Sequence, residues 1–169
     1  MNLKFCCVIM SAIVFLSGVV AGAETMMSGP AEGYKIHVLA PHQMEDGKVG
    51  GPFHHYCKPI RGGLVLQCLL FTSTTPDAAL VGVEYFVDKS LARKNVPLIQ
   101  WNRHFHDHEI EIATGRVQVL DVSADEANAI AKKAAGTDGI IFELWQEGAP
   151  IPDGKVTFPT SVGHVFRAR

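Results

Sequence analysis

The stretch LVLQCLLFTSTTPDAALVGVEYFVD, residues 64–88, holds two strongly apolar, β-favouring segments and decides the fold class. Residues 64–72 are almost continuously apolar, as is typical of a core strand. Residues 79–88 are a second core strand in which alternate side chains share one face: Val81, Val83, Tyr85 and Val87. Because a short turn around Pro76 separates the segments, we expect an antiparallel hairpin.

Shorter candidates for regular structure lie on both sides of this hairpin. Further strands are expected over residues 34–39, 53–59, 104–112, 117–122, 140–145 and 162–166. Residues 40–51 are expected to be a loop, and residues 89–102 a short helix interrupted near Pro97. The clearest helix covers residues 123–135, with Ser123 and Glu126 as a capping box and Gly136 as its stop. The sum predicts one α+β domain, a mostly antiparallel sheet with one main helix packed on it.

Composition excludes several classes of protein. Of 169 residues, 47% are hydrophobic and 19% are charged, a balance that excludes a mostly disordered chain. The formal net charge of −2 and the lack of a basic stretch give no support to a nucleic-acid partner. The Ala-rich helix, with only Lys132 and Lys133 as basic residues, predicts no strong membrane binding.

The first 23 residues have the pattern of a secretory signal peptide. Lys4 precedes an apolar run that ends at the A-x-A motif Ala21-Gly22-Ala23. Cleavage there predicts a periplasmic or secreted protein with a disordered leader over residues 24–33 and a domain over residues 34–169. In such a compartment Cys57 and Cys68 can pair, although the sequence leaves a disulfide and two separate buried thiols equally open.

Eight histidines are an unusual number for this length, and most fall in two groups. If residues 104–112 form a strand, then His104, His106 and His108 share one face. Imidazoles spaced in this way can converge on a transition metal such as zinc or copper. The side chains most suited to join them from neighbouring strands are His54, His55, Cys57 and Glu84. The alternative is a set of half-buried histidines held by hydrogen bonds.

Two catalytic alternatives fit less well. His104, His106 and Glu111 have the H-x-H-x4-E spacing of the first cupin motif, but the later part of that pattern is missing. A dyad of Cys57 and His55 would share a strand face without the aligned hydrogen bond that activates a thiolate. We therefore assign no catalytic residue.

Four separated motifs then show a family resemblance. HHYC at residues 54–57, QCLLF at 67–71, LVGVEYFV at 80–87 and HDHEIEIATG at 106–115 resemble the oil body-associated proteins of plants. The resemblance spans roughly residues 36–155 and implies a shared fold and a shared His-rich site, with no established reaction. The motif positions are His54, His55, Tyr56, Cys57, Gln67, Cys68, Gly82, Glu84, Tyr85, His106, His108, Glu111 and Gly115.

The polar motif residues lie on strands expected to be apolar, so they should satisfy one another. We expect the two histidine groups to meet around a metal ion or small ligand. The expected metal ligands are His54, His55, His106, His108, Glu84 and Glu111, with Tyr56, Cys57 and His104 lining a ligand site. The rival hypothesis is a structural or lipid-surface-associated protein whose histidines form a hydrogen-bonded core network.

Overall fold

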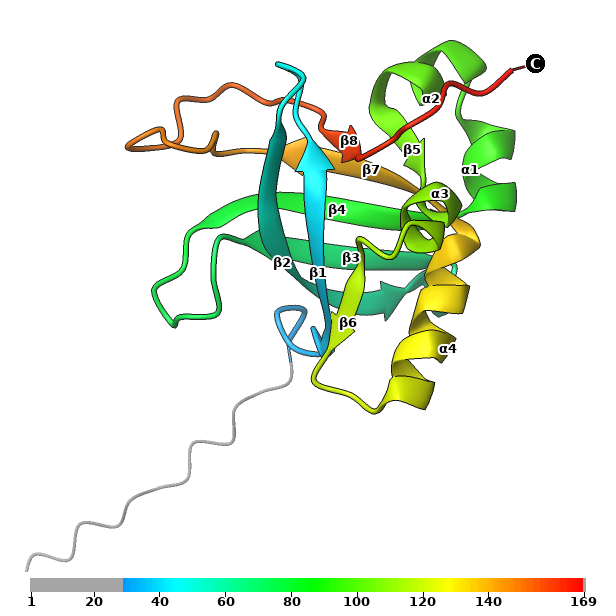
Figure 1. Cartoon of the computed structure of the whole chain (residues 1–169), viewed down its shortest axis with the longest axis horizontal. Helices are drawn as coiled ribbons and strands as arrows, with labels where there is room; N and C mark the ends of the chain where they lie inside the picture. Colours follow the sequence, from blue (N-terminus) through cyan, green and yellow to red (C-terminus); the bar gives the residue numbers. More distant parts are fainter. Residues whose placement is uncertain (1–28, 169) are drawn as a thin grey trace, which may run out of the picture.

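An antiparallel sheet that curls until it is nearly barrel-shaped forms the centre of the molecule (Figure 1). The computed structural model describes residues 29–168, so the expected signal peptide lies outside the described residues. The strands are β1 (Ile36–Gln43), β2 (Val49–Ile60), β3 (Val65–Phe71), β4 (Leu80–Asp88), β5 (Phe105–Asp107), β6 (Gln118–Leu120), β7 (Thr137–Glu143) and β8 (Thr160–Ser161). Their order is β5-β7-β4-β3-β2-β1-β6, with β8 paired to β1.

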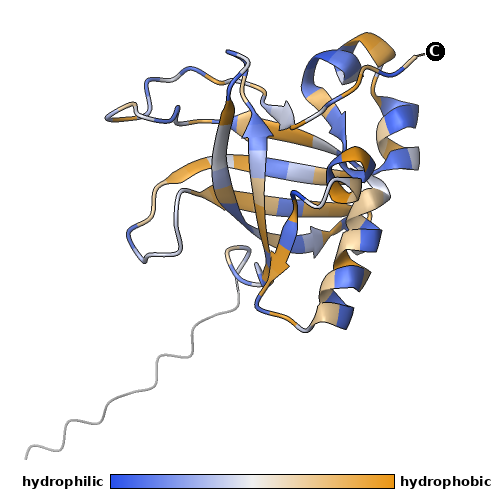
Figure 2. Ribbon diagram, viewed as in Figure 1, coloured by the Kyte–Doolittle hydropathy of each residue, from blue (hydrophilic) through white to orange (hydrophobic). Residues whose placement is uncertain are grey.

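The hairpin predicted from residues 64–88 is confirmed as β3 and β4. The face of β4 that carries Val83, Tyr85 and Val87 is not the enclosed one, however. Because the sheet curls, its enclosed face carries Glu84 and Phe86, which are 2% and 5% exposed, whereas Val83 and Tyr85 are only half-buried. Figure 2 shows hydrophilic segments among the orange central strands.

Several helices pack beside the sheet, rather than the one main helix expected (Figure 1). Four α-helices occur in residues 29–168: α1 (Lys89–Asn95), α2 (Leu98–His104), α3 (His108–Ala113) and α4 (Ala124–Ala135). The break between α1 and α2 falls at Pro97, as predicted. The serine half of the predicted capping box is confirmed at α4, where Ser123 Oγ accepts a hydrogen bond from Glu126 N at 3.3 Å.

The strand predicted over residues 104–112 is wrong. The segment is the end of α2, the short strand β5 and the helix α3 in succession. Asp107 causes the change, because its carboxylate accepts a hydrogen bond from Glu109 N at 2.9 Å and so caps α3. His106 therefore lies on a strand and His108 on a helix.

Other boundaries also differ from the expectations. The loop expected over residues 40–51 is mostly strand, since β1 and β2 extend into it and leave a short turn. The last strand, β8, precedes the predicted segment 162–166. At the start of the described chain, Glu32 N donates to Gly29 O and Lys58 Nζ donates to the carbonyls of Pro30 and Glu32. No helix in residues 29–168 has the length and hydropathy needed to cross a bilayer.

Two links fix this architecture. Cys57 of β2 and Cys68 of β3 are direct register partners, and they form a disulfide. Asp138 of β7 is fully buried and joins the helices to the sheet. Its carboxylate accepts from Arg93 Nη2 of α1 at 2.8 Å and from Trp101 Nε1 of α2 at 2.8 Å. A buried carboxylate with two such partners is well satisfied.

Candidate metal centre

The carboxylate of Glu84 lies inside the curled sheet, where three imidazoles surround it. His106 Nε2 and His108 Nε2 lie 3.2 Å and 3.1 Å from Glu84 Oε1. His55 Nε2 lies 3.2 Å from Glu84 Oε2. All four side chains are at most 2% exposed. They come from β4, β5, α3 and β2, so the fold brings together residues that are far apart in the sequence.

A glycine makes room for the two neighbouring histidines. Gly139 of β7 is the register partner of His106. A Cβ at this position would lie 2.4 Å from His106 Nε2 and 2.6 Å from His108 Cε1. Because a hydrogen occupies that space, the two Nε2 atoms approach to 3.2 Å. The close packing of rings against backbone requires glycine here.

His42 of β1 extends the cluster on the opposite side. Its Nε2 lies 3.0 Å from His55 Nε2, and the ring is 3% exposed. The donors form two groups of three residues, and Glu84 belongs to both. One group is His42, His55 and Glu84, and the other is Glu84, His106 and His108. Within each group the donor atoms all lie within 4.8 Å of one another.

The outer nitrogens of two rings have fixed protonation. His55 Nδ1 lies 3.0 Å from the carbonyl oxygen of Phe53, which can only accept, so this nitrogen carries a proton. His108 Nδ1 lies 2.8 Å from Thr137 Oγ1, and that hydroxyl donates to Ala134 O at 2.6 Å. The hydroxyl must therefore accept from His108. In their neutral forms both rings direct the lone pair of Nε2 at the Glu84 carboxylate.

Burial and charge act against each other at the centre. Burial raises the pKa of Glu84, but hydrogen bonds from the surrounding imidazoles outweigh it and hold that pKa well below its ordinary value. Burial and the neighbouring His55 lower the pKa of His42 well below its ordinary range. Burial lowers the pKa of His55 too, but Glu84 overcomes this and leaves it raised. When His55 and His108 are neutral, the ionised Glu84 faces their Nε2 lone pairs, an arrangement that a cation satisfies.

Glu111 of α3 adds a second buried carboxyl group. It is 3% exposed, and its Oε1 has no hydrogen-bond partner among residues 29–168. Burial raises its pKa to about 7, while His106 lowers it and Glu84 raises it further. The charges of His106 and Glu84 thus influence the pKa of the Glu111 side chain.

The distances suit a metal ion. For bonds of about 2.1 Å, adjacent ligands lie about 3.0 Å apart at right angles and about 3.4 Å apart at the tetrahedral angle. The triangle formed by Glu84 Oε1, His106 Nε2 and His108 Nε2 has sides of 3.1, 3.2 and 3.2 Å. Two imidazoles and one carboxylate are a donor set for zinc, copper or iron.

Of the remaining residues from the sequence analysis, His54, Tyr56 and His104 lie away from Glu84, whereas Cys57 lies on the face of β2 that carries His55. His54 lies on the outer face of β2, where its Nδ1 is 2.9 Å from His37 Nε2, and His37 Nδ1 is 2.6 Å from Asp121 Oδ2. Tyr56 stacks on His37 at 4.4 Å. His104 packs on Phe158 at 4.3 Å. Cys57 is in the disulfide. The expectation that His104, His106 and His108 share a strand face is wrong because α2 ends at His104.

Sequence reasoning missed His42, because residues 40–51 read as a loop. A signal was present, since Ile36, Val38, Ala40 and His42 continue one alternation. The structure shows that β1 extends through His42 to Gln43, and that Val38, Ala40 and His42 are all buried.

Comparisons with known proteins agree with the motif resemblance. Oil body-associated protein 1B of Arabidopsis thaliana is 29% identical over 93 residues, 55% of this chain and 37% of that protein. Oil body-associated protein 2B of Zea mays is 33% identical over 105 residues, 60% of this chain and 40% of that protein. The chain thus matches less than half the length of either relative. No solved structure matches it significantly.

The family described as "Protein of unknown function (DUF1264)" matches residues 28–165. This match covers nearly all of the described domain, including every side chain of the metal centre. The chain therefore belongs to this family of unknown function, and over part of its length it is similar in sequence to oil body-associated proteins.

Proposed function

We propose that this protein is a metal-binding domain whose centre is Glu84 with His106 and His108. His55 and His42 complete the donor set on the other side of the carboxylate. The observation that carries the proposal is the near-equilateral triangle of donor atoms, 3.1 to 3.2 Å on each side, inside the sheet. Zinc and copper are the first candidates because both accept imidazole and carboxylate ligands.

The rival is a hydrogen-bonded network without an ion. Because Nδ1 is already protonated on His55 and His108, each ring can donate to Glu84 only as an imidazolium. Two such cations against one buried carboxylate leave an uncompensated charge, which is costly away from water. An ionised Glu111 would bring either the two imidazoliums or one divalent ion to zero charge, so charge balance does not separate the two. The ion differs in that it uses both buried rings in their neutral forms, with the Nε2 lone pairs as ligands.

Metal analysis of untagged protein tests the proposal. We expect stoichiometric zinc or copper after purification, or after the metal-free protein is reloaded and desalted. His106→Ala and His108→Ala should each lose that metal. His54→Ala is the matched control for His55→Ala, because the two neighbours lie on opposite faces of β2 and only His55 faces Glu84. Less than about a tenth of an equivalent after reloading would refute the proposal, since a real site is stoichiometric.

We further propose that the protein is exported. Support comes from the signal-like residues 1–23 and from the disulfide between Cys57 and Cys68, a bond typical of oxidising compartments. Cell fractionation with intact-mass measurement tests this. The expected product begins at Glu24 and is recovered outside the cytoplasm, and a cytoplasmic chain that retains residues 1–23 would contradict it.

A further inference from the structure

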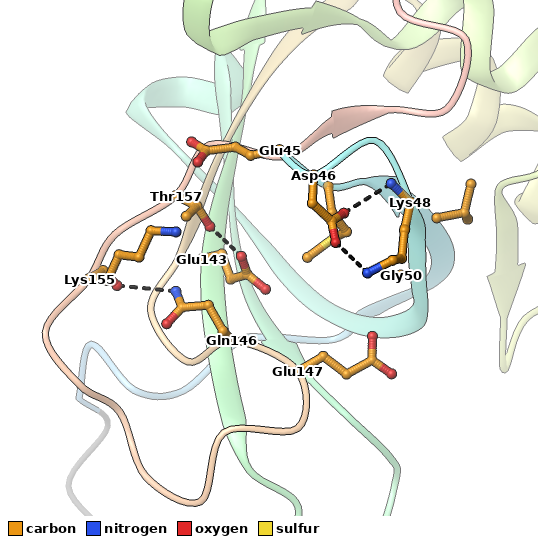
Figure 3. A pocket seen from close by; sticks show the side chains of 11 residues that line it. Glu45, Asp46, Lys48, Gly50, Glu143, Gln146, Glu147, Lys155 and Thr157 are labelled. Carbon is orange, nitrogen blue, oxygen red and sulfur yellow. Dashed lines mark hydrogen bonds and ion pairs between the residues drawn. The ribbon is translucent and has the colours of Figure 1, made fainter.

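An open pocket of about 410 Å³ lies at one end of the curled sheet (Figure 3). Residues 44–46 and 48 from the β1–β2 connection, with residues 49–50 at the start of β2, form one wall. Glu143 at the end of β7 and residues from the following segment, among them Glu147 and Lys155, form the rest. None of its lining residues is a donor of the metal centre.

A narrow cleft continues from this pocket toward the centre. It shares Met44 and Glu143 with the pocket, and His42 is among its lining residues. Its volume of about 10 Å³ is close to the minimum that holds one water molecule. The narrow cleft thus borders both the pocket and His42, and Met44 lines the pocket and the cleft.

Met44 is packed so that its movement would change this narrow cleft. An ideal Cβ on Gly50 would lie 2.8 Å from Met44 Sδ, which places the thioether directly against the backbone of β2. Gly50 is itself the register partner of His42. Met44 is only half-buried, and methionine has three rotatable bonds and adapts easily.

The pocket carries an excess of negative charge. Four carboxylates line it, against the two ammonium groups of Lys48 and Lys155: Glu45, Asp46, Glu143 and Glu147. Lys48 is engaged by Asp46, since Lys48 Nζ lies 2.7 Å from its Oδ2. Glu143 lies deepest, 7% exposed, with the hydroxyl of Thr157 donating to it (Figure 3). A concave surface lined by one sign of charge concentrates ions of the other sign.

We propose that this pocket is the entrance through which hydrated divalent cations reach the metal centre, with Met44 as the gate. The inference rests on the proposed function, because an entrance requires a centre that binds metal. The cation is attracted by the carboxylates, passes Met44 when its side chain moves, and meets His42 first.

The test measures the rates of metal uptake and release. Metal-free protein is mixed with Co²⁺ in a stopped-flow instrument, absorbance reports binding, and excess EDTA reports release. Met44→Ala should accelerate both rates by a similar factor of at least about threefold, whereas Met44→Phe should slow both. The equilibrium stoichiometry should stay at the wild-type value in each variant, which also shows that the variants fold.

A charge variant tests the other half of the inference. Glu147→Gln should slow uptake several-fold at low ionic strength and little at high salt, because screening removes steering. Asp77→Asn, which removes an exposed carboxylate from the β3–β4 turn outside the pocket, is the matched control and should leave uptake unchanged.

Equal rates in wild type and both Met44 variants would overturn the inference and leave the metal centre intact. So would an equal effect of Glu147→Gln and Asp77→Asn on uptake. Failure of the wild-type protein to bind Co²⁺, zinc or copper at all would instead overturn the proposed function, and the entrance with it.

Discussion

Replacing Gly139 with alanine should dismantle the metal centre without removing a single donor atom. The new Cβ would lie 2.4 Å from His106 Nε2 and 2.6 Å from Cε1 of both His106 and His108. Unbonded carbon and nitrogen atoms pack at about 3.5 Å, so the rings must retreat by about 1 Å. The new methyl group projects toward the two Nε2 atoms that are 3.2 Å apart in the native protein.

The size of the effect follows from these distances. A displacement of about 1 Å is roughly a third of the donor spacing, and misplacement on that scale costs about 100-fold in a geometry-dependent site. We therefore expect zinc affinity to fall about 100-fold, or about 2.7 kcal/mol. Overpacking should also lower the free energy of unfolding of the metal-free protein by about 1–3 kcal/mol.

Competitive zinc titration by calorimetry and urea unfolding of the metal-free protein measure the two effects separately. Gly82→Ala is the matched control, because its Cβ would lie 2.7 Å from the Phe142 carbonyl oxygen on the same strand pair. That variant should lose stability and keep its zinc affinity. If folded Gly139→Ala binds zinc within about threefold of wild type, less than about 0.7 kcal/mol, the assignment of His106 and His108 as ligands is refuted.

Three further predictions concern stability. Burial raises the pKa of Glu111 to about 7, above its ordinary 4.5, so the folded protein favours the protonated form. The contribution of Glu111 to the unfolding free energy of the metal-free protein should thus be fully present below pH 4.5 and fall by about 3 kcal/mol as pH rises through 7. In urea titrations Glu111→Gln should remove this pH dependence. Asp138→Asn should cost about 1–3 kcal/mol, measured by urea unfolding at pH 7, because the neutral amide weakens the charge-assisted bonds that the buried carboxylate accepts from Trp101 and Arg93; an unchanged midpoint would contradict this. Replacing Cys57 and Cys68 together with alanine opens a crosslink of sequence separation 11 and should cost about 3 kcal/mol, whereas equal stability with and without the bond would show that it does not constrain the unfolded chain.

The parts of the fold that depend on local sequence were predictable. The β3–β4 hairpin follows from two apolar segments and a short turn, and α4 follows from Ser123 and Glu126. Segment 104–112 was not predictable from alternation, because the cap formed by Asp107 acts over two residues and overrides the pattern. A period-two pattern over such a short segment does not distinguish a strand from a capped helix turn.

The sequence predicted which types of residue form the candidate site, but it predicted less well which individual histidines face Glu84. His55, His106, His108 and Glu84 converge as expected, because buried polar groups must satisfy one another. His54 turns outward because successive side chains on a strand point to opposite faces. Which of two adjacent histidines faces inward depends on strand pairing and on the curl of the sheet, which are long-range properties.

If Glu84 and the surrounding imidazoles bind a metal, the disulfide affects which metals they can bind. Cys57 follows His55 by two residues on the same face of β2, and Cys68 is the register partner of Glu84, so both sulfurs belong to the wall beside the donors. Joined to each other, they leave only nitrogen and oxygen as ligands. As free thiolates they would offer a soft alternative that Cu(I) prefers over carboxylate. Oxidation before loading would therefore protect the protein from capturing the wrong metal.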